Sequence, residues 1–284
     1  MLDMSTDRPS IEFLEIMVIR GCNLSCQGCT TFSDLRHAGY VTWQTGKSWI
    51  KLWTHRLDIQ AVGIMGGEPL MNPEIGQWLK GLRQMLPQAQ IRFVTNGLLL
   101  DRHWHIVDLL EDLGNCVLKI SYHIQDTALD SVIDKIQASR NWKPVTEFGI
   151  DRWTSPSGFR FQIARPTKFF KTFRGSYTDM RPHDNSPSDA FAMCVQKKCP
   201  LLYNGRIWKC GTLALTPDML DRMGNPNYDL WVPYIQSGLT ADCDQLELKK
   251  FISNFGQPHS VCRQCPTDKD LDSILDHSAT VVFK

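Results

Sequence analysis

Ten cysteines in a chain of 284 residues are the side chains most able to do chemistry. They are too few for a fold held by disulfides, which typically contains about 8–10% cysteine. In a reducing compartment cysteines more often bind metals, act in catalysis or pack in cores. They form an early group, a single residue and a late group: Cys22, Cys26 and Cys29; Cys116; and Cys194, Cys199, Cys210, Cys243, Cys262 and Cys265. The spacing predicts two metal sites.

The early group has the spacing C-x3-C-x2-C, from Cys22 through Cys26 to Cys29. Three thiolates on one short loop can bind three irons of a cubane [4Fe–4S] cluster, whereas the common electron-transfer clusters use four cysteines. One iron would then stay open to an outside chelator, as in catalytic metal centres generally. The alternative is a zinc site completed by a distant histidine or cysteine.

The late group includes a hairpin signal at Asn204-Gly205, between two apolar runs. A two-residue turn there pairs Leu201 with Trp208 and places Cys199 opposite Cys210. Cross-strand partners have Cβ atoms about 4.5–5.5 Å apart, so both sulfurs could reach one metal centre. Two further ligands come from a C-x2-C pair, which gives the expected set Cys199, Cys210, Cys262 and Cys265. A structural zinc site and a disulfide between Cys199 and Cys210 are the alternatives.

The elements that must position these groups follow from hydrophobic periodicity. Strands are expected at residues 11–19, 59–65, 91–94, 117–123 and 160–164, with a sixth near 146–150; helices are expected at 43–57, 74–85, 101–113 and 129–140. Alternating strands and helices with short connections predict parallel βαβ units. Five or six strands are too few for a closed eight-stranded barrel, so we expect an open, partial barrel. Residues 1–170 would form this α/β core, 171–193 a polar linker, and 194–284 a small cysteine-rich module.

Gly66-Gly67-Glu68-Pro69 follows the second expected strand, beside the cysteine loop after the first. The two motifs together resemble the radical S-adenosylmethionine superfamily over about residues 11–170. The resemblance implies a partial (β/α)6 barrel and a [4Fe–4S] cluster on Cys22, Cys26 and Cys29, whose open iron binds S-adenosylmethionine. Residues expected to contact that ligand are Gly66, Gly67, Glu68, Pro69, Asn96 and Ser121, with His123 near ribose or substrate. One departure from the family is Gly28, where an aromatic residue often precedes the third cysteine.

The same resemblance implies a reaction. One electron from the reduced cluster would cleave S-adenosylmethionine to methionine and a 5′-deoxyadenosyl radical, which removes a hydrogen atom from the substrate. Oxidation, crosslinking or epimerisation of a small molecule or peptide would follow, and a flavodoxin- or ferredoxin-type protein would supply electrons. In an epimerase a cysteine thiol returns the hydrogen, and Cys243 or Cys194 is the candidate. The rival hypothesis is a zinc-stabilised, non-catalytic binding protein.

The hairpin with its later cysteine pair also resembles the twitch or SPASM modules that bind an auxiliary cluster after many such barrels. The family spacing C-x9–15-G-x4-C is met by Cys194, Gly205 and Cys210, so Cys194 is the alternative ligand to Cys199. The full SPASM ligand set is not present, which favours a module with a single second [4Fe–4S] cluster.

Overall composition excludes other classes of protein. Lys plus Arg number 31 and Asp plus Glu 30, a net charge of +1 that does not indicate binding to nucleic acid or to a membrane surface. No apolar run reaches the roughly 18 residues of a transmembrane helix. The first ten residues, MLDMSTDRPS, lack the features of a signal peptide, so we expect a cytoplasmic protein.

Overall fold

A nine-stranded sheet in the order β13-β12-β2-β5-β6-β7-β10-β9-β8 forms the centre of the computed structural model, which describes residues 8–147 and 150–283. Its strands, in chain order, are β2 (Leu14–Ile19), β5 (Ala61–Gly66), β6 (Gln90–Thr95), β7 (Cys116–Ser121), β8 (Lys143–Glu147), β9 (Ile150–Thr154), β10 (Arg160–Ala164), β12 (Leu201–Tyr203) and β13 (Arg206–Trp208). β13 and β8 are the two edge strands and do not pair with each other, so the sheet of the described residues is open, as expected for a partial barrel.

Six neighbouring strands, β12, β2, β5, β6, β7 and β10, pair in parallel. Five of them are the strands expected from the sequence. The sixth is β12, from the late part of the chain, and not the segment near residues 146–150. There β8 and β9 form an antiparallel hairpin that continues from β10, and residues 148–149 lie outside the described part. The expected strand at 11–19 is divided into β1 (Ser10–Ile11) and β2, and β1 pairs with β4 (Asp58–Ile59).

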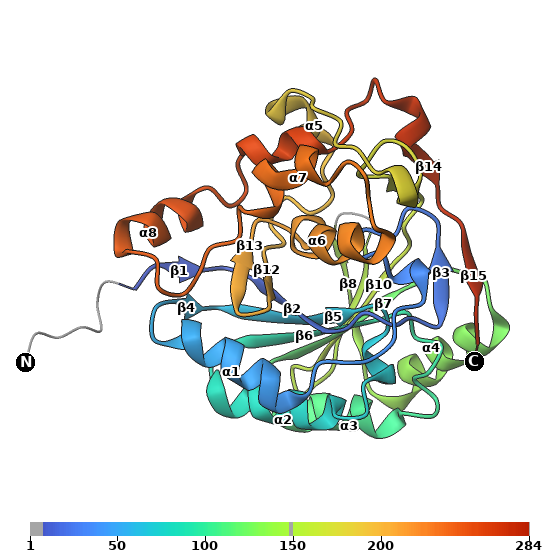
Figure 1. The fold of residues 1–284 in the computed structure, drawn as a ribbon. Helices are drawn as coiled ribbons and strands as arrows, with labels where there is room; N and C mark the ends of the chain where they lie inside the picture. The colour runs from blue at the N-terminus through green and yellow to red at the C-terminus, as the bar shows by residue number, and fades with distance from the viewer. Residues whose placement is uncertain (1–7, 148–149, 284) are drawn as a thin grey trace, which may run out of the picture.

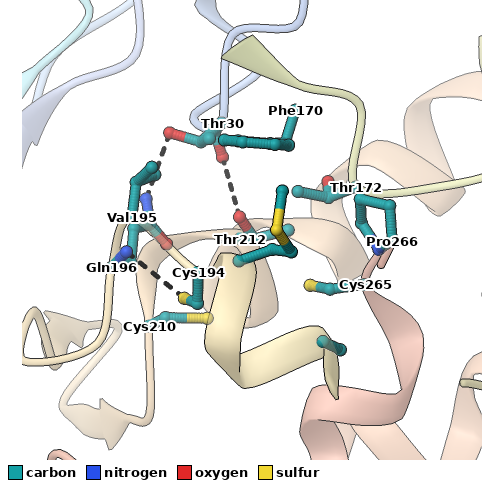
Figure 2. Close-up of a pocket in the computed structure, with 12 residues that line it drawn as sticks. Thr30, Phe170, Thr172, Cys194, Val195, Gln196, Cys210, Thr212, Cys265 and Pro266 are labelled. Atoms are coloured by element: carbon teal, nitrogen blue, oxygen red, sulfur yellow. Dashed lines mark hydrogen bonds between the residues drawn. The ribbon is translucent and has the colours of Figure 1, made fainter. Parts of the chain in front are cut away.

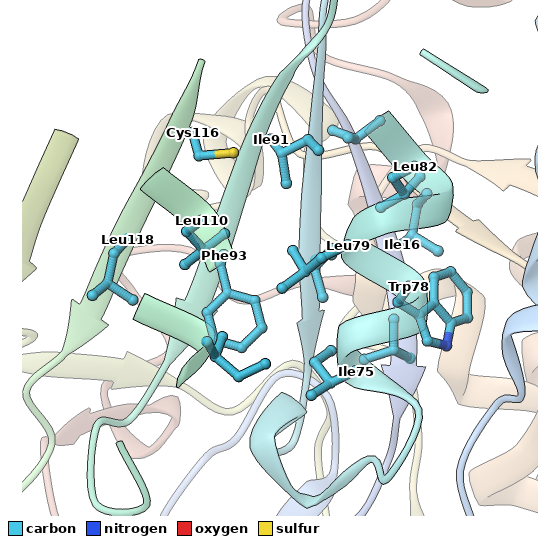
Figure 3. Packing of buried hydrophobic residues seen from close by; sticks show 14 of the residues in the cluster. Ile16, Ile75, Trp78, Leu79, Leu82, Ile91, Phe93, Leu110, Cys116 and Leu118 are labelled. Carbon is cyan, nitrogen blue, oxygen red and sulfur yellow. The ribbon is translucent and has the colours of Figure 1, made fainter. Parts of the chain in front are cut away.

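Four helices cover one face of the sheet (Figure 1): α1 (Trp43–Thr54), α2 (Ile75–Met85), α3 (Trp104–Leu113) and α4 (Thr127–Ser139). All four were expected, and their ends differ from the expected ones by at most three residues. Figure 3 shows Ile75 and Leu79 of α2 on the side of the helix toward Phe93 of β6, whereas Trp78 points away, where it contacts Trp43 of α1. Cys116 is fully buried in the same core.

The hairpin predicted at Asn204-Gly205 is confirmed. Tyr203 pairs with Arg206, Leu202 with Ile207 and Leu201 with Trp208. Both turn residues have positive φ, 50° at Asn204 and 74° at Gly205, which is the backbone of a type I′ turn. The pairing ends at Leu201, because the preceding residue is Pro200, whose carbonyl accepts a hydrogen bond from Glu15 N of β2.

The late part of the chain lies over the other face of the sheet (Figure 1). Its helices are α5 (Pro187–Met193), α6 (Gly211–Met223), α7 (Tyr228–Ile235) and α8 (Gln245–Ser253), with 3₁₀ turns η3 (Tyr177–Asp179), η4 (Ser260–Gln264) and η5 (Leu271–Ser273). The expected linker, 171–193, thus contains η3 and α5. Leu202 and Ile207 belong to the same buried core as β2, β5 and β6, so the hairpin is part of the barrel core.

Two short strand pairs connect the end of the chain to the barrel. β11 (Lys168–Phe170) pairs with β14 (Ile274–Asp276), and β15 (Ala279–Val281) pairs with β3 (Leu24–Cys26) inside the cysteine loop. We call residues 274–282 the strap. No helix among the described residues is long and apolar enough to cross a membrane.

Candidate active site

The three cysteines of the early group line one cavity of about 210 Å³ at the carboxyl ends of the parallel strands. Cys22 follows β2, Cys26 ends β3, and Cys29 lies on the turn after it. Gly66 and Gly67 form another part of the wall, because the carboxyl ends of neighbouring parallel strands lie side by side. The structure therefore brings together the two motifs on which the resemblance rests.

The environment of these thiols disfavours their charged form. Burial and the nearby Cys29 sulfur raise the pKa of Cys26 well above its usual range, and burial raises that of Cys22 to about 12. Two donors face Cys22 Sγ: Leu24 N at 3.4 Å and Asn96 Nδ2 at 3.8 Å. Thiols in such a cavity ionise only when a cation compensates their charge, so the donor set fits an iron–sulfur cluster.

The Gly66-Gly67 turn packs backbone against backbone on the start of the cysteine loop. Gly67 N donates to Ile19 O and Glu68 N to Gly21 O, each at 2.9 Å. A Cβ at Gly67 would lie 2.1 Å from Gly21 O, and one at Gly66 2.3 Å from Ile19 O. The glycines are thus required by the contact between two loops, in addition to the close ligand approach that we expected.

Glu68 and Pro69, expected to contact the ligand, do not line the cavity. Glu68 is fully buried, and its carboxylate accepts hydrogen bonds from Leu70 N, Thr95 Oγ1 and Asn96 N. Burial raises its pKa to about 7, although these three donors oppose the shift. Glu68 therefore supports the wall formed by Asn96, and is not itself part of that wall.

Polar groups at other strand ends face the cavity as expected. Asn96, Ser121 and His123 all line it, and Asn96 Nδ2 donates to Asn23 Oδ1 at 2.7 Å. His123 Nδ1 lies 2.9 Å from Nε2 of His277 on the strap, and the two rings stack. Burial lowers the pKa of His123 to about 4, so the pair is neutral at physiological pH.

The wall near Gly28 is built by residues that the sequence did not indicate. Gly28 has φ 73°, and a Cβ there would meet Leu275 Cδ1 at 2.9 Å and Phe169 Cβ at 3.3 Å. Phe169 of β11 also lines the cavity. Side chains from β11 and the strap thus fill the space beside the third cysteine, where the family often has an aromatic residue.

Cysteines of the late group form a second site above the sheet. Cys194, Cys210, Cys262 and Cys265 line one small cavity of about 30 Å³. Figure 2 shows the sulfur atoms of Cys194, Cys210 and Cys265 directed toward one another, with Gln196 N donating to Cys194 Sγ at 3.3 Å. Burial, reinforced by the neighbouring sulfurs, raises the pKa values of Cys194, Cys210 and Cys265, to about 12 for Cys210.

Cys199, expected to complete this set, does not line the cavity. Its side chain hydrogen-bonds to Glu15 on the inner face of the sheet. The hairpin register does not extend past Leu201, so Cys199 is not paired with Cys210 and the geometry places Cys194 with the other three. Cys243, the candidate hydrogen donor, lines neither cysteine cavity. It lies beside Arg56 after α1, whose Nη1 is 3.4 Å from its sulfur, because the segment before α8 packs there.

Thr30, the residue after Cys29, connects the two sites. It lines the first cavity and also a pocket of about 40 Å³ bounded by Cys194, Cys210 and Cys265. Gln196 Nε2 donates to Thr30 Oγ1 at 3.1 Å, and Thr212 Oγ1 to Thr30 O at 3.4 Å (Figure 2). In the part of the chain that the structure describes, no three His, Cys, Asp or Glu side chains are arranged around a single metal ion. This arrangement is compatible with a cubane cluster, because the cysteines of a cubane each bind a different iron.

The barrel and its cysteine loop match a known family. Residues 16–147 fit the family model described as the Radical SAM superfamily. The chain contains a Radical SAM superfamily domain. This Radical SAM domain includes Cys22, Cys26 and Cys29 with the Gly66-Gly67 turn, whereas the second cysteine site lies beyond it.

Curated relatives are similar over part of their length. GTP 3′,8-cyclase of Microcystis aeruginosa is 26% identical over 134 residues, 46% of this chain and 39% of that protein. GTP 3′,8-cyclase of Petrotoga mobilis is 30% identical over 99 residues, 33% of this chain and 30% of that protein. The chain therefore spans about two fifths or less of either relative.

Two solved structures are also similar to this chain. BtrN in complex with AdoMet and 2-DOIA has a TM-score of 0.49 at 13% identity, covering 91% of this chain and 94% of BtrN. SuiB of Streptococcus suis bound to S-adenosylmethionine has a TM-score of 0.35 at 20% identity, covering 42% of this chain and 27% of SuiB.

Proposed function

We propose that this chain is a radical S-adenosylmethionine enzyme that oxidises its substrate with the help of a second, auxiliary iron–sulfur cluster. The observation that carries the proposal is the convergence of Cys22, Cys26 and Cys29 on one cavity with the Gly66-Gly67 turn. Three thiolates leave one iron of a cubane without a protein ligand, and the family model over this region supports S-adenosylmethionine as the chelator.

When bound, the cluster and S-adenosylmethionine supply an organic radical that removes a hydrogen atom from a carbon of the substrate. The chain's own residues hold and shield this chemistry. Leu24 N and Asn96 Nδ2 donate toward Cys22 Sγ, which stabilises its thiolate form. Phe169 and the strap cover the loop beside Gly28 and reduce contact of the cavity with bulk water.

Our proposed auxiliary ligands are Cys194, Cys210, Cys262 and Cys265. Four cysteines are sufficient to bind every iron of a cubane, so such a cluster would exchange electrons without binding substrate. This favours net oxidation, because a cluster held by these four cysteines would supply an electron acceptor. It disfavours epimerisation by Cys243, since that thiol lies beside Arg56 and not at either cavity.

We propose a small polar molecule as the substrate. The side chains of Ser121 and His123 face the cavity and can hydrogen-bond to hydroxyl or amino groups. The GTP 3′,8-cyclases share only part of their length with this chain, so their reaction is a weaker candidate. A flavodoxin- or ferredoxin-type protein is the proposed electron donor.

Iron and sulfide analysis of anaerobically reconstituted protein tests the two-cluster proposal. Wild type should bind about eight irons, and Cys26→Ala and Cys194→Ala about four each, at four irons per cubane. Cys199→Ala is the matched control, a cysteine five residues from Cys194, and should keep about eight. With dithionite, Cys26→Ala should lose 5′-deoxyadenosine formation, while Cys194→Ala and Cys199→Ala should retain it.

Other outcomes would contradict specific parts of the proposal. Colourless protein that contains zinc would support the zinc-stabilised, non-catalytic alternative. A loss of iron in Cys199→Ala but not in Cys194→Ala would return Cys199 to the ligand set. Four irons in wild type, with 5′-deoxyadenosine still formed, would support the radical chemistry but contradict the proposed auxiliary cluster.

A further inference from the structure

Lys209 is a buried lysine beside the second cysteine site. Its side chain precedes Cys210 and is only 6% exposed. It lines the same cavity as the four late cysteines. Lysine is almost never fully buried unless a partner compensates its charge, so this position needs a physical reason.

No carboxylate among the described residues pairs with Lys209. Its Nζ donates to Asn254 O at 2.9 Å and lies over two aromatic rings, 5.4 Å from the centre of Phe191 and 5.6 Å from that of Phe255. A carbonyl and two ring faces orient an ammonium group but do not neutralise it. Lys209 shares one cavity with Cys194, Cys210 and Cys262, whose sulfurs would be negative as thiolate ligands of a cluster. The charge of Lys209 is thus directed at the proposed cluster.

We propose that Lys209 is a fixed cation that raises the reduction potential of the auxiliary cluster, so that this cluster accepts the electron left on the substrate. The proposal rests on the proposed function, because it requires a cluster on Cys194, Cys210, Cys262 and Cys265. One electron enters the cluster from the substrate radical, and Lys209 itself gains or loses neither an electron nor a proton.

The sign of the effect follows from electrostatics. Adding an electron makes a thiolate-bound cluster more negative, so a nearby cation stabilises the reduced form more than the oxidised form. The effect is large because the cation is buried, where the effective dielectric constant is low and mobile ions do not screen it. Net charge and hydrogen bonding around the sulfurs are among the factors that set the potentials of iron–sulfur clusters.

Lys197 provides a matched control. Its Nζ lies 5.6 Å from the centre of the same Phe191 ring, but its side chain is exposed to solvent. Water and salt screen an exposed charge, so its removal should change the cluster potential much less.

A redox titration of the reconstituted full chain, followed by electron paramagnetic resonance, tests the proposal. Lys209→Met and Lys209→Gln should each lower the ratio of reduced to oxidised auxiliary cluster about tenfold at a fixed applied potential. For a one-electron couple, this corresponds to a midpoint potential about 59 mV lower than in wild type. Lys209→Arg and Lys197→Met should remain close to wild type. The first cluster should titrate as in wild type in all four variants.

Iron content separates failure of this inference from failure of the proposed function. About four irons in wild type would show that the auxiliary cluster is not formed, which would contradict both the two-cluster proposal and the role of Lys209. About eight irons in Lys209→Met and Lys209→Gln with unchanged midpoints would overturn only the role of Lys209. If both variants lost the second cluster while Lys209→Arg kept it, Lys209 would be needed for assembly, which would also overturn the tuning role.

Discussion

At the residue scale, the wall of the first cavity depends on two positions where no side chain fits. The backbone at Gly66 and Gly67 touches the carbonyl groups of Ile19, at the end of β2, and of Gly21, in the cysteine loop that follows. Backbone carbonyls cannot rotate away as flexible side chains can. A methyl group at either position must therefore move the cysteine loop.

Gly67→Ala should destabilise the fold by about 1–3 kcal/mol or more, the usual cost of overpacking, and weaken binding of S-adenosylmethionine. Gly76→Ala in α2 is the control, since the nearest atom to its Cβ is Leu109 Cδ2 at 4.0 Å and alanine favours helix. Chemical denaturation and isothermal titration calorimetry measure the two effects. Equal stability of the two variants would contradict the packing argument.

Glu15 of β2 predicts a pH dependence of stability. Burial raises its pKa from 4.5 to about 7, against the opposing effects of Lys119, the Cys199 hydrogen bond and Arg92. Between these two pH values the folded chain holds a proton that the unfolded chain has released. The contribution of Glu15 to the free energy of unfolding should therefore be greatest below pH 4.5 and fall as pH rises to about 7.

Urea denaturation from pH 5 to pH 8 should show this decrease, with a shallower slope in Glu15→Gln. Some slope should remain, because the pKa of Glu68 is raised to about 7 as well. Exposed Glu12→Gln, three residues away, should keep the wild-type slope. An unchanged slope in Glu15→Gln would show that Glu15 is not protonated in this range.

Some residues of the candidate sites could be predicted from the sequence, and others could not. Spacing alone predicts that Cys22, Cys26 and Cys29 lie together, because a short loop limits how far apart they can be, and in the structure they line one cavity. The choice between Cys194 and Cys199 depends on where the hairpin stops, and Pro200 bonds to β2 instead of continuing the pair. Lys209 could not be found in this way, because its burial depends on Phe191 and Phe255, which are distant in sequence.

At the scale of elements, the strap is the part of the structure that most directly protects the cysteine loop. β15 pairs with β3 from Ala279 with Cys26 to Val281 with Leu24. Gln27 N donates to Ser278 O at 2.9 Å and Val282 N to Asn23 O at 2.8 Å. Without this pairing, the loop that carries the three cysteines would have one unpaired strand edge facing solvent.

Removal of residues 274–284 should make the first cluster more sensitive to oxygen. Iron loss in air should be several-fold faster than in wild type, and in the metal-free protein Cys26, only 8% exposed, should react faster with N-ethylmaleimide. Removal of residues 283–284 alone leaves both strand pairs and is the control. Identical rates for the two truncations would exclude a protective role.

Helices α6 and α7 were not expected from the sequence, although α1 to α4 were. Each contains a proline, Pro217 in α6 and Pro233 in α7, which in sequence indicates a helix boundary. Tertiary contacts overcome that cost: in α6, Leu213, Leu215 and Met219 are buried against the hairpin and η3. Local propensity cannot predict such helices, since the stabilising surface comes from other segments.

At the scale of the whole molecule, the late part of the chain is built into the barrel. β12 occupies the sixth parallel position next to β2, and Trp53 Nε1 of α1 donates to Gly205 O in the hairpin turn at 3.0 Å. Leu202 lies in the main core with Ile16 and Ile64. The barrel is complete only when residues beyond 200 are present.

The chain should therefore unfold in one cooperative transition. Leu202→Ala, at a fully buried position, should cost about 2–5 kcal/mol and lower the unfolding midpoint for both halves together. Leu52→Ala, at a side chain that is 50% exposed, should change stability little. Hydrogen exchange of the β5 amides measures the stability of the early part of the chain, and that of the β12 amides the stability of the late part. Faster exchange in Leu202→Ala confined to β12 would indicate an independent module.

The pairing of β15 with β3 also sets an order of events during biosynthesis. The ribosome produces the cysteine loop some 250 residues before its partner strand, so on the nascent chain one edge of this loop stays open. A cluster on the proposed ligands Cys22, Cys26 and Cys29 would therefore enter most readily in that interval, or after the strap has been displaced.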